Sequence, residues 1–84
     1  MSLEVLRNPR LRVIGLKQTT KAVERGQART VYLAGDADER LVRDLVSKCR
    51  ERGIELVRVE SMAALGKACG IDVGAAAAAL VRSE

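Results

Sequence analysis

The sequence predicts an α/β fold, because three short β-type runs alternate with three helical patterns along the chain. The first run, residues 11–14, ends at Gly15, and the last, residues 54–59, is apolar mainly at alternate positions. Between them, residues 30–34 are rich in β-branched and aromatic side chains and almost continuously apolar, as in a central strand covered on both faces. This alternation predicts a sheet with helices on both sides.

The first half of the chain has two helical segments. Residues 3–6 predict a short helix that Ser2 could cap and that Asn8 and Pro9 would end. Residues 17–25 predict a longer helix with a C-cap at Gly26. We expect its inward-facing side chains to be Leu16, Thr20 and Val23.

Two further helices are marked by their caps. Asp36 or Asp38 can cap the second long helix, which Gly53 ends, and Ser61 can cap the third, which Gly70 ends. The expected inward faces are Leu41, Val42, Leu45, Val46 and Cys49 in the second helix and Met62, Leu65 and Cys69 in the third.

The last segment, residues 75–81, is ambiguous from the residues alone. Its run of alanines favours a helix, because alanine is the best helix former. The alternation of strands and helices favours a closing strand that would complete the sheet.

Composition limits the class of protein. Residues 1–84 suffice for one small domain, and a hydrophobic content of 48% excludes a disordered chain. No segment predicts a membrane span or a signal peptide, so we expect a cytoplasmic protein. Because histidine is absent and Cys49 and Cys69 are 20 positions apart, we expect no metal site, no cofactor and two buried thiols. Tyr32 is the only aromatic residue, which excludes a base-stacking platform.

Positive charge is concentrated early in the sequence. Residues 1–29 hold seven basic and two acidic residues, whereas residues 30–84 hold eight basic and nine acidic residues. This distribution predicts a polyanionic partner that binds around residues 15–21.

Residues 15–21 have the composition of a ligand-binding helix start. The first turn of a helix presents N–H groups without intrahelical partners and the positive end of the helix dipole. Lys17 and Lys21 are four positions apart and share a face, and Gln18 can both donate and accept hydrogen bonds. The alternative is an ordinary solvated first turn.

Several motifs resemble the kink-turn RNA-binding family of archaeal ribosomal protein L7Ae and eukaryotic L30e, especially its small bacterial members. The resemblance covers residues 14–81. Its motifs are Gly15-x-Lys17-Gln18-Thr19-x-Lys21-Ala22, Ala34-x-Asp36-Ala37-Asp38, Leu65-Gly66-x-Ala68-Cys69-Gly70 and Ile71-Asp72-Val73. It implies a three-layer α/β/α sandwich around a four-stranded mixed sheet, with residues 75–81 as a strand.

The resemblance also implies an RNA-binding site. In the family, the turn that matches Gly15, Leu16, Lys17, Gln18 and Lys21 enters the widened major groove of a kinked duplex at tandem sheared G·A pairs. Archaeal members have Asn-Glu where this chain has Lys17-Gln18. A change at this pair affects which kink-turns are preferred.

A second family segment, matched by Ile71, Asp72 and Val73, packs on the bulged nucleotides at the kink. Ile71 and Val73 could instead be core residues. Asp38 lies near the family's RNA site but could be only a helix cap, and Met62 is not assigned to the site.

These observations lead to a hypothesis with two alternatives. The leading hypothesis is a non-catalytic, monomeric protein that stabilises kink-turns in ribosomal RNA, a riboswitch or another structured RNA, with the ribosome as a possible partner. One alternative is an enzyme or nucleotide-binding domain, in which Asp36 and Asp38 could bind a divalent ion. The other is a protein-interaction module without RNA specificity.

Overall fold

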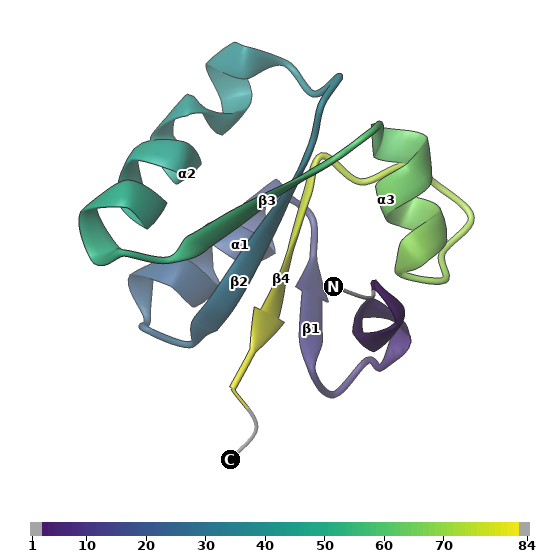
Figure 1. Cartoon of the computed structure of the whole chain (residues 1–84), viewed down its shortest axis with the longest axis horizontal. Coiled ribbons are helices and arrows are strands. Elements are labelled where there is room, and N and C mark those ends of the chain that lie inside the picture. Colours follow the sequence, from purple (N-terminus) through teal and green to yellow (C-terminus); the bar gives the residue numbers. More distant parts are fainter. Residues whose placement is uncertain (1–2, 83–84) are drawn as a thin grey trace.

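The computed structural model describes residues 3–82 and contains the predicted alternation of strands and helices (Figure 1). The elements in chain order are a 3-10 helix η1 (Glu4–Arg7), β1 (Arg12–Ile14), α1 (Leu16–Glu24), β2 (Ala28–Ala34), α2 (Glu39–Arg52), β3 (Glu55–Val59), α3 (Met62–Ala68) and β4 (Ala77–Val81). The predicted cap of the short helix, Ser2, lies outside the described residues. No helix within residues 3–82 is long and apolar enough to span a membrane.

The four strands form one mixed sheet in the order β1-β4-β2-β3. β4 is antiparallel to both β1 and β2, whereas β2 and β3 are parallel. α2 provides the crossover between the parallel pair, since parallel strands require a long connection.

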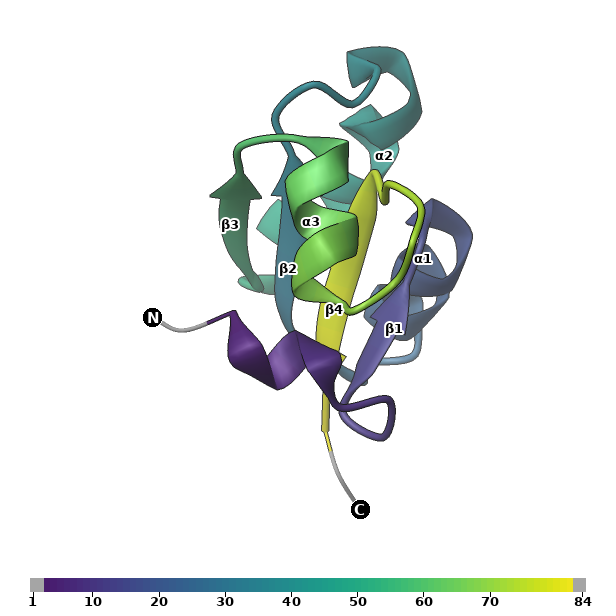
Figure 2. The same ribbon diagram turned by 90° about the vertical axis from the view of Figure 1, so that its right-hand side faces the viewer.

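Helices cover both faces of the sheet and make it the middle of three layers (Figure 2). Successive strand residues point to opposite faces. Tyr32, Ala34 and Ala78 therefore pack in one cluster with Leu65 of α3, while the neighbouring strand residues pack with α1 and α2 on the other side. The predicted α/β/α architecture is confirmed.

β4 is a strand in spite of its alanines. Ala77, Ala78 and Ala79 are fully buried, and β4 pairs with β1 on one side and β2 on the other. Ladder hydrogen bonds on both sides and burial on both faces override the helix propensity of alanine. Its small side chains also allow close packing of helices above and below.

Two predicted helix faces need correction. The fully buried residues of α1 are Thr19, Ala22 and Val23, whereas Leu16 and Thr20 are only half-buried. In α2, Leu41 is 62% exposed, whereas its neighbour Val42 is half-buried against the core and Leu45 is buried, so the inward face begins at Val42. Apolar spacing gives the period of a helix, but its rotation against the sheet is set by tertiary packing.

Candidate nucleic-acid interface

All three α-helices begin at the same end of the sheet (Figure 1). β1, β2 and β3 finish at this end, each followed by a helix, and β4 starts there. We call it the helix-start end; it comprises residues 15–21, 35–41, 60–62 and 73–76. The positive ends of three helix dipoles are therefore on one side of the molecule.

The start of α1 differs from the other two in having no side-chain cap. Its N-cap residue is Gly15, with a φ of +97°, and the first turn contains no acidic residue. The Gly15 N–H donates to the Ala77 carbonyl at 2.8 Å, which fixes this turn to β4. Because Gly15 has no side-chain acceptor, the first N–H groups of α1 are available to a ligand.

The other two helix starts are capped by carboxylates and a hydroxyl. Asp38 accepts a hydrogen bond from the Arg40 N–H at 2.9 Å at the start of α2. At the start of α3, Ser61 accepts from the Ala64 N–H at 3.0 Å and Asp36 accepts from the Met62 N–H at 2.7 Å. Of the three helix starts, that of α1 is the one best suited to an external anion.

Three exposed side chains surround this open turn. Lys17, Gln18 and Lys21 point into solvent, and none of them makes an ion pair or hydrogen bond with another residue of the described chain. Leu16 is half-buried and packs against the core cluster on the α1 and α2 side of the sheet. Leu16 thus anchors the turn, while its polar neighbours are free to bind.

The loop that follows α3 runs back along this helix toward the helix-start end (Figure 2). The Ile71 N–H donates to the Gly66 carbonyl and the Ala75 N–H to the Met62 carbonyl, each at 3.0 Å. Ile71 is half-buried and packs against the core, as its structural interpretation predicts. Val73 is 70% exposed, however, and Asp72 is exposed as well. Val73 is available for an apolar contact with a partner.

Met62 is a candidate that sequence reasoning missed. It is 37% exposed rather than facing inward, and its Cβ lies 3.2 Å from the position that a Cβ on Gly74 would take. Together with Val73 it makes an apolar surface beside the loop. The available signal was its position directly after the capping Ser61, since the first residue of a helix often projects beyond the packed layer.

Asp38 is positioned chiefly by its structural role. Its carboxylate bonds the Arg40 backbone and forms a 3.1 Å ion pair with the Arg40 guanidinium. The hydrogen bond with the Arg40 side chain, and to a smaller extent that with the Arg40 backbone, lowers the pKa of Asp38 below its ordinary value. Asp36 is also occupied, as a cap of α3. Within residues 3–82 no three His, Cys, Asp or Glu residues are grouped as a metal site.

Comparison with known proteins identifies the family. The sequence profile of the ribosomal protein L7Ae/L30e/S12e/Gadd45 family matches residues 2–84. The chain belongs to this family. It is 49% identical over 76 residues to RNA-binding protein TTE2299 of Caldanaerobacter subterraneus subsp. tengcongensis, covering 90% of this chain and 93% of that protein.

Other relatives of this L7Ae-family chain come from archaea and eukaryotes. The large ribosomal subunit protein eL8 of Halobacterium salinarum is 47% identical over 81 residues, which is 95% of this chain and 68% of that protein. Among solved structures, the Giardia lamblia 15.5kD RNA binding protein superimposes with a TM-score of 0.87 at 29% identity, covering 98% of this chain and 69% of its own.

The charge distribution of this family member differs from the prediction. Of the seven basic residues in positions 1–29, Lys17 and Lys21 alone lie toward the start of α1. Arg12 instead donates to the Leu6 carbonyl at 2.9 Å and to the Cys69 carbonyl at 3.4 Å, while Arg25 caps the far end of α1. β1, α1 and β2 each run from one end of the sheet to the other, so residues adjacent in sequence are separated in space.

The helix-start end is consequently of mixed charge. Its acidic residues, on the loops and first turns around Lys17 and Lys21, are Asp36, Asp38, Glu39 and Glu60. General attraction to a polyanion is therefore weak at this end. Binding there has to rely on individual donors in defined positions, which favours selective recognition over non-specific attraction.

Proposed function

We propose that this chain is an RNA-binding protein that recognises kink-turns, with the start of α1 as its base-reading element. The observation that carries the proposal is the uncapped, acid-free first turn of α1, flanked by two unpaired lysines. Membership of the L7Ae family and the names of its relatives support RNA as the ligand. The family is non-enzymatic, in agreement with the sequence-based hypothesis.

The geometry suits a distorted RNA duplex. The major groove of regular A-form RNA is too narrow for side chains, but a kinked internal loop opens it. Gly15 allows close approach of the backbone, Lys17 can donate to guanine O6 and N7, and Lys21 can reach a base or a phosphate. Gln18 offers both a donor and an acceptor to a base edge.

The loop after α3 would contribute a second contact. Val73 and Met62 present apolar surface, and apolar side chains can pack against unstacked bases. Asp72, at the same loop, adds an acceptor for a base or a 2′-hydroxyl. Asp38 is proposed to shape the site through its cap on α2, and Ile71 through its core packing, more than by direct contact.

Binding at both places would stabilise the kinked form. Free RNA of this kind exchanges between extended and kinked conformations, and only the kinked one can contact α1 and the loop together. The protein shifts the population by the difference in its affinity for the two forms. The chain then acts as an RNA-folding partner and needs no catalytic group.

The decisive experiment is a calorimetric titration of a kink-turn RNA and of a variant in which Watson–Crick pairs replace the G·A pairs. We expect tight binding to the intact RNA alone. Lys17→Ala should cost about 1–3 kcal/mol on the intact RNA and little on plain duplex. Arg43→Ala, which removes an exposed charge on α2, is the matched control. Equal affinity for both RNAs would refute the kink-turn proposal.

Ribosomal RNA is the target that we favour, because eL8 of Halobacterium salinarum is named as a ribosomal subunit protein. The cytoplasmic location and the monomeric state stay predictions from the sequence. The nucleotide-binding alternative has no supporting observation, since both of its aspartates act as helix caps.

A further inference from the structure

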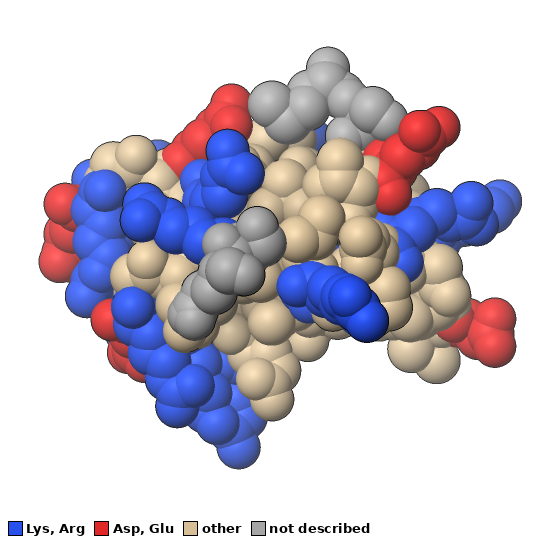
Figure 3. All heavy atoms as spheres, turned by 90° about the horizontal axis from the view of Figure 1, so that it is seen from below, with Lys and Arg blue, Asp and Glu red and all other residues tan. Residues whose placement is uncertain are grey.

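A second basic surface lies at the opposite end of the sheet, where the helices finish and β2 and β3 begin; we call this the helix-stop end. It contains a hollow of about 550 Å³ whose lining residues are Ala28, Arg29, Arg52, Gly53, Ile54 and Arg82. Figure 3 views the molecule from this side and shows Lys and Arg side chains over much of the surface, with acidic ones nearer the rim.

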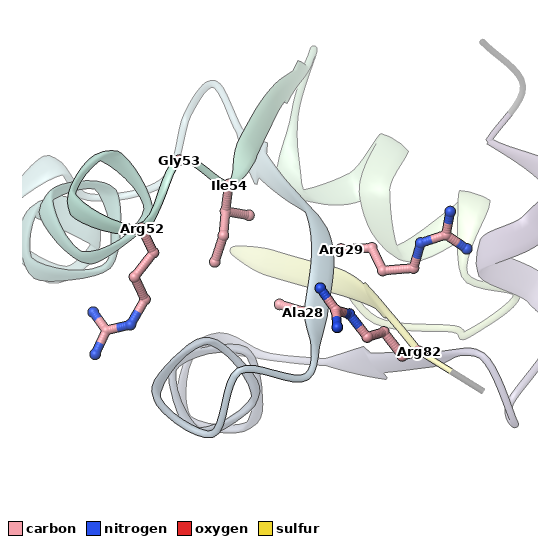
Figure 4. Close-up of a pocket in the computed structure, with 6 residues that line it drawn as sticks. All are labelled: Ala28, Arg29, Arg52, Gly53, Ile54 and Arg82. Carbon is pink, nitrogen blue, oxygen red and sulfur yellow. The ribbon is translucent and has the colours of Figure 1, made fainter. Parts of the chain in front are cut away.

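Two arginines border the hollow from opposite sides. Arg52 is the last residue of α2, and Arg82 follows β4 (Figure 4). The Arg82 N–H donates to the Gln27 carbonyl at 3.0 Å, which holds it beside the turn between α1 and β2. Ala28 and Ile54 lie between the two guanidinium groups, while the head of Arg29 points away from the hollow (Figure 4).

Neither Arg52 nor Arg82 takes part in any of the ion pairs found within residues 3–82. Glu24 is paired with Lys48 at 3.4 Å. Glu55, which follows Ile54 at the hollow, is exposed and forms no ion pair with either arginine within residues 3–82. Both guanidinium groups are therefore available to an external anion.

Favourable interaction with helix dipoles does not explain this arrangement. Arg52 at the end of α2 does complement the negative end of that dipole. Arg29 lies at the start of β2 and Arg82 follows β4, however, so neither residue is stabilised by a helix dipole as the last residue of a helix would be. Two arginines from different parts of the chain therefore border one hollow without an ion-pair partner within residues 3–82, and this arrangement points to a ligand.

An RNA segment that is bound at the start of α1 does not extend to this hollow, because the two sites lie at opposite ends of the sheet. β2 spans the distance between the two ends, and its seven residues correspond to roughly 20 Å. An RNA groove seated on the start of α1 would leave the helix-stop end free. Arginine matches phosphate well, because its planar fork of donors fits two phosphate oxygens.

We propose that the hollow between Arg52 and Arg82 binds backbone phosphates of a second RNA segment, separate from the one at the start of α1. The inference rests on the proposed function only in taking RNA as the polyanion. The polar side chains that line the hollow are arginines, whose paired donors fit phosphate oxygens, so we expect them to contact the RNA backbone. The protein would thereby hold two parts of a folded RNA together.

The test compares two double variants of equal net charge: Arg52→Gln with Arg82→Gln, and the control Arg58→Gln with Lys67→Gln, which lie away from the hollow. The probes are a minimal kink-turn RNA and a plain 20-base-pair RNA duplex, measured over a range of salt concentrations. We expect the first variant to lose about tenfold in duplex affinity and to lower the salt slope by about two, one for each phosphate contact. Its kink-turn affinity should change less than twofold.

A competition experiment separates the two sites. Wild-type protein saturated with unlabelled kink-turn RNA should still bind labelled duplex, and the Arg52 and Arg82 variant should bind it about tenfold more weakly under the same conditions. Displacement of the duplex by the kink-turn, or equal losses in the two double variants, would overturn the proposal. The proposal would also be overturned if polyglutamate competed with the labelled duplex as well as an RNA of equal charge does. If the wild type shows no kink-turn preference while the hollow variant still loses duplex binding, the proposed function fails and the second site stands.

Discussion

Gly66→Ala should disturb the loop that presents Val73. Gly66 is buried within α3, and a Cβ at this position would lie 2.0 Å from the Val73 carbonyl oxygen and 3.1 Å from Gly74 Cα. Real Cβ contacts are essentially never shorter than 3.0 Å, so the loop backbone has to move by about 1 Å. The obstacle is backbone, which cannot rotate away as a side chain could.

Two opposing effects set the magnitude. Alanine gains about 1 kcal/mol over glycine in a helix. Overpacking costs about 1–3 kcal/mol, and movement of the loop weakens the hydrogen bonds from Ile71 to Gly66 and from Ala75 to Met62, each contributing about 1 kcal/mol. We expect a net destabilisation of about 2 kcal/mol, which for a domain of this size lowers Tm by about 8–16 °C.

Urea unfolding and amide chemical shifts of residues 70–76 provide the assay. Gly74→Ala is the graded control, because its Cβ would lie 3.2 Å from Met62 Cβ and needs a movement of only a few tenths of an ångström. It should cost less than about 1 kcal/mol. If Gly66→Ala were as stable as the wild type with unchanged loop shifts, the steric reasoning would be refuted.

Three further predictions concern buried and capping groups. The Thr19 hydroxyl is buried without a hydrogen-bond partner among the described residues, so Thr19→Val should raise the free energy of urea unfolding by about 1 kcal/mol. The control Thr20→Val loses the 2.8 Å hydrogen bond to the Leu16 carbonyl and should not stabilise the fold. Equal effects of the two substitutions would contradict the prediction. Burial raises the pKa of both Cys49 and Cys69. A thiol reagent at pH 8 should therefore modify the native protein slowly and the urea-unfolded protein fast. Rapid labelling of the native state would be inconsistent with buried thiols. Because the pKa of Asp38 is lowered on folding, its contribution to stability is complete above the unfolded value of about 4 and is lost as pH falls through the folded value. Asp38→Asn keeps an acceptor for the cap and should flatten Tm against pH in that acidic range; an unchanged pH profile would exclude Asp38 as its source.

Features that depend on a few consecutive residues could be predicted from the sequence. Asp38 and Ser61 cap the helices that they precede, and Gly53 ends α2 in a left-handed conformation, because each of these interactions is closed within one helical turn. The alternation of strands and helices followed from the periods of the apolar residues, and Cys49 and Cys69 are buried as expected. Of the motif residues, Gly15 is the N-cap of α1, and Lys17, Gln18 and Lys21 are exposed on that helix.

Features that depend on contacts between distant residues were decided by the tertiary structure. The alternation of elements and the family resemblance favoured a closing strand, and residues 77–81 form one because β1 and β2 pair with them on both sides, against the propensity of their alanines. The same long-range packing half-buries Ile71 and leaves Val73 exposed two residues later, and it places Arg29 and Arg82 at the end of the sheet opposite Lys17. Sequence determines what each segment prefers within one or two turns. The strands and helices carry the chain back and forth across the sheet, and this path decides which side chains meet and at which end of the molecule charge collects.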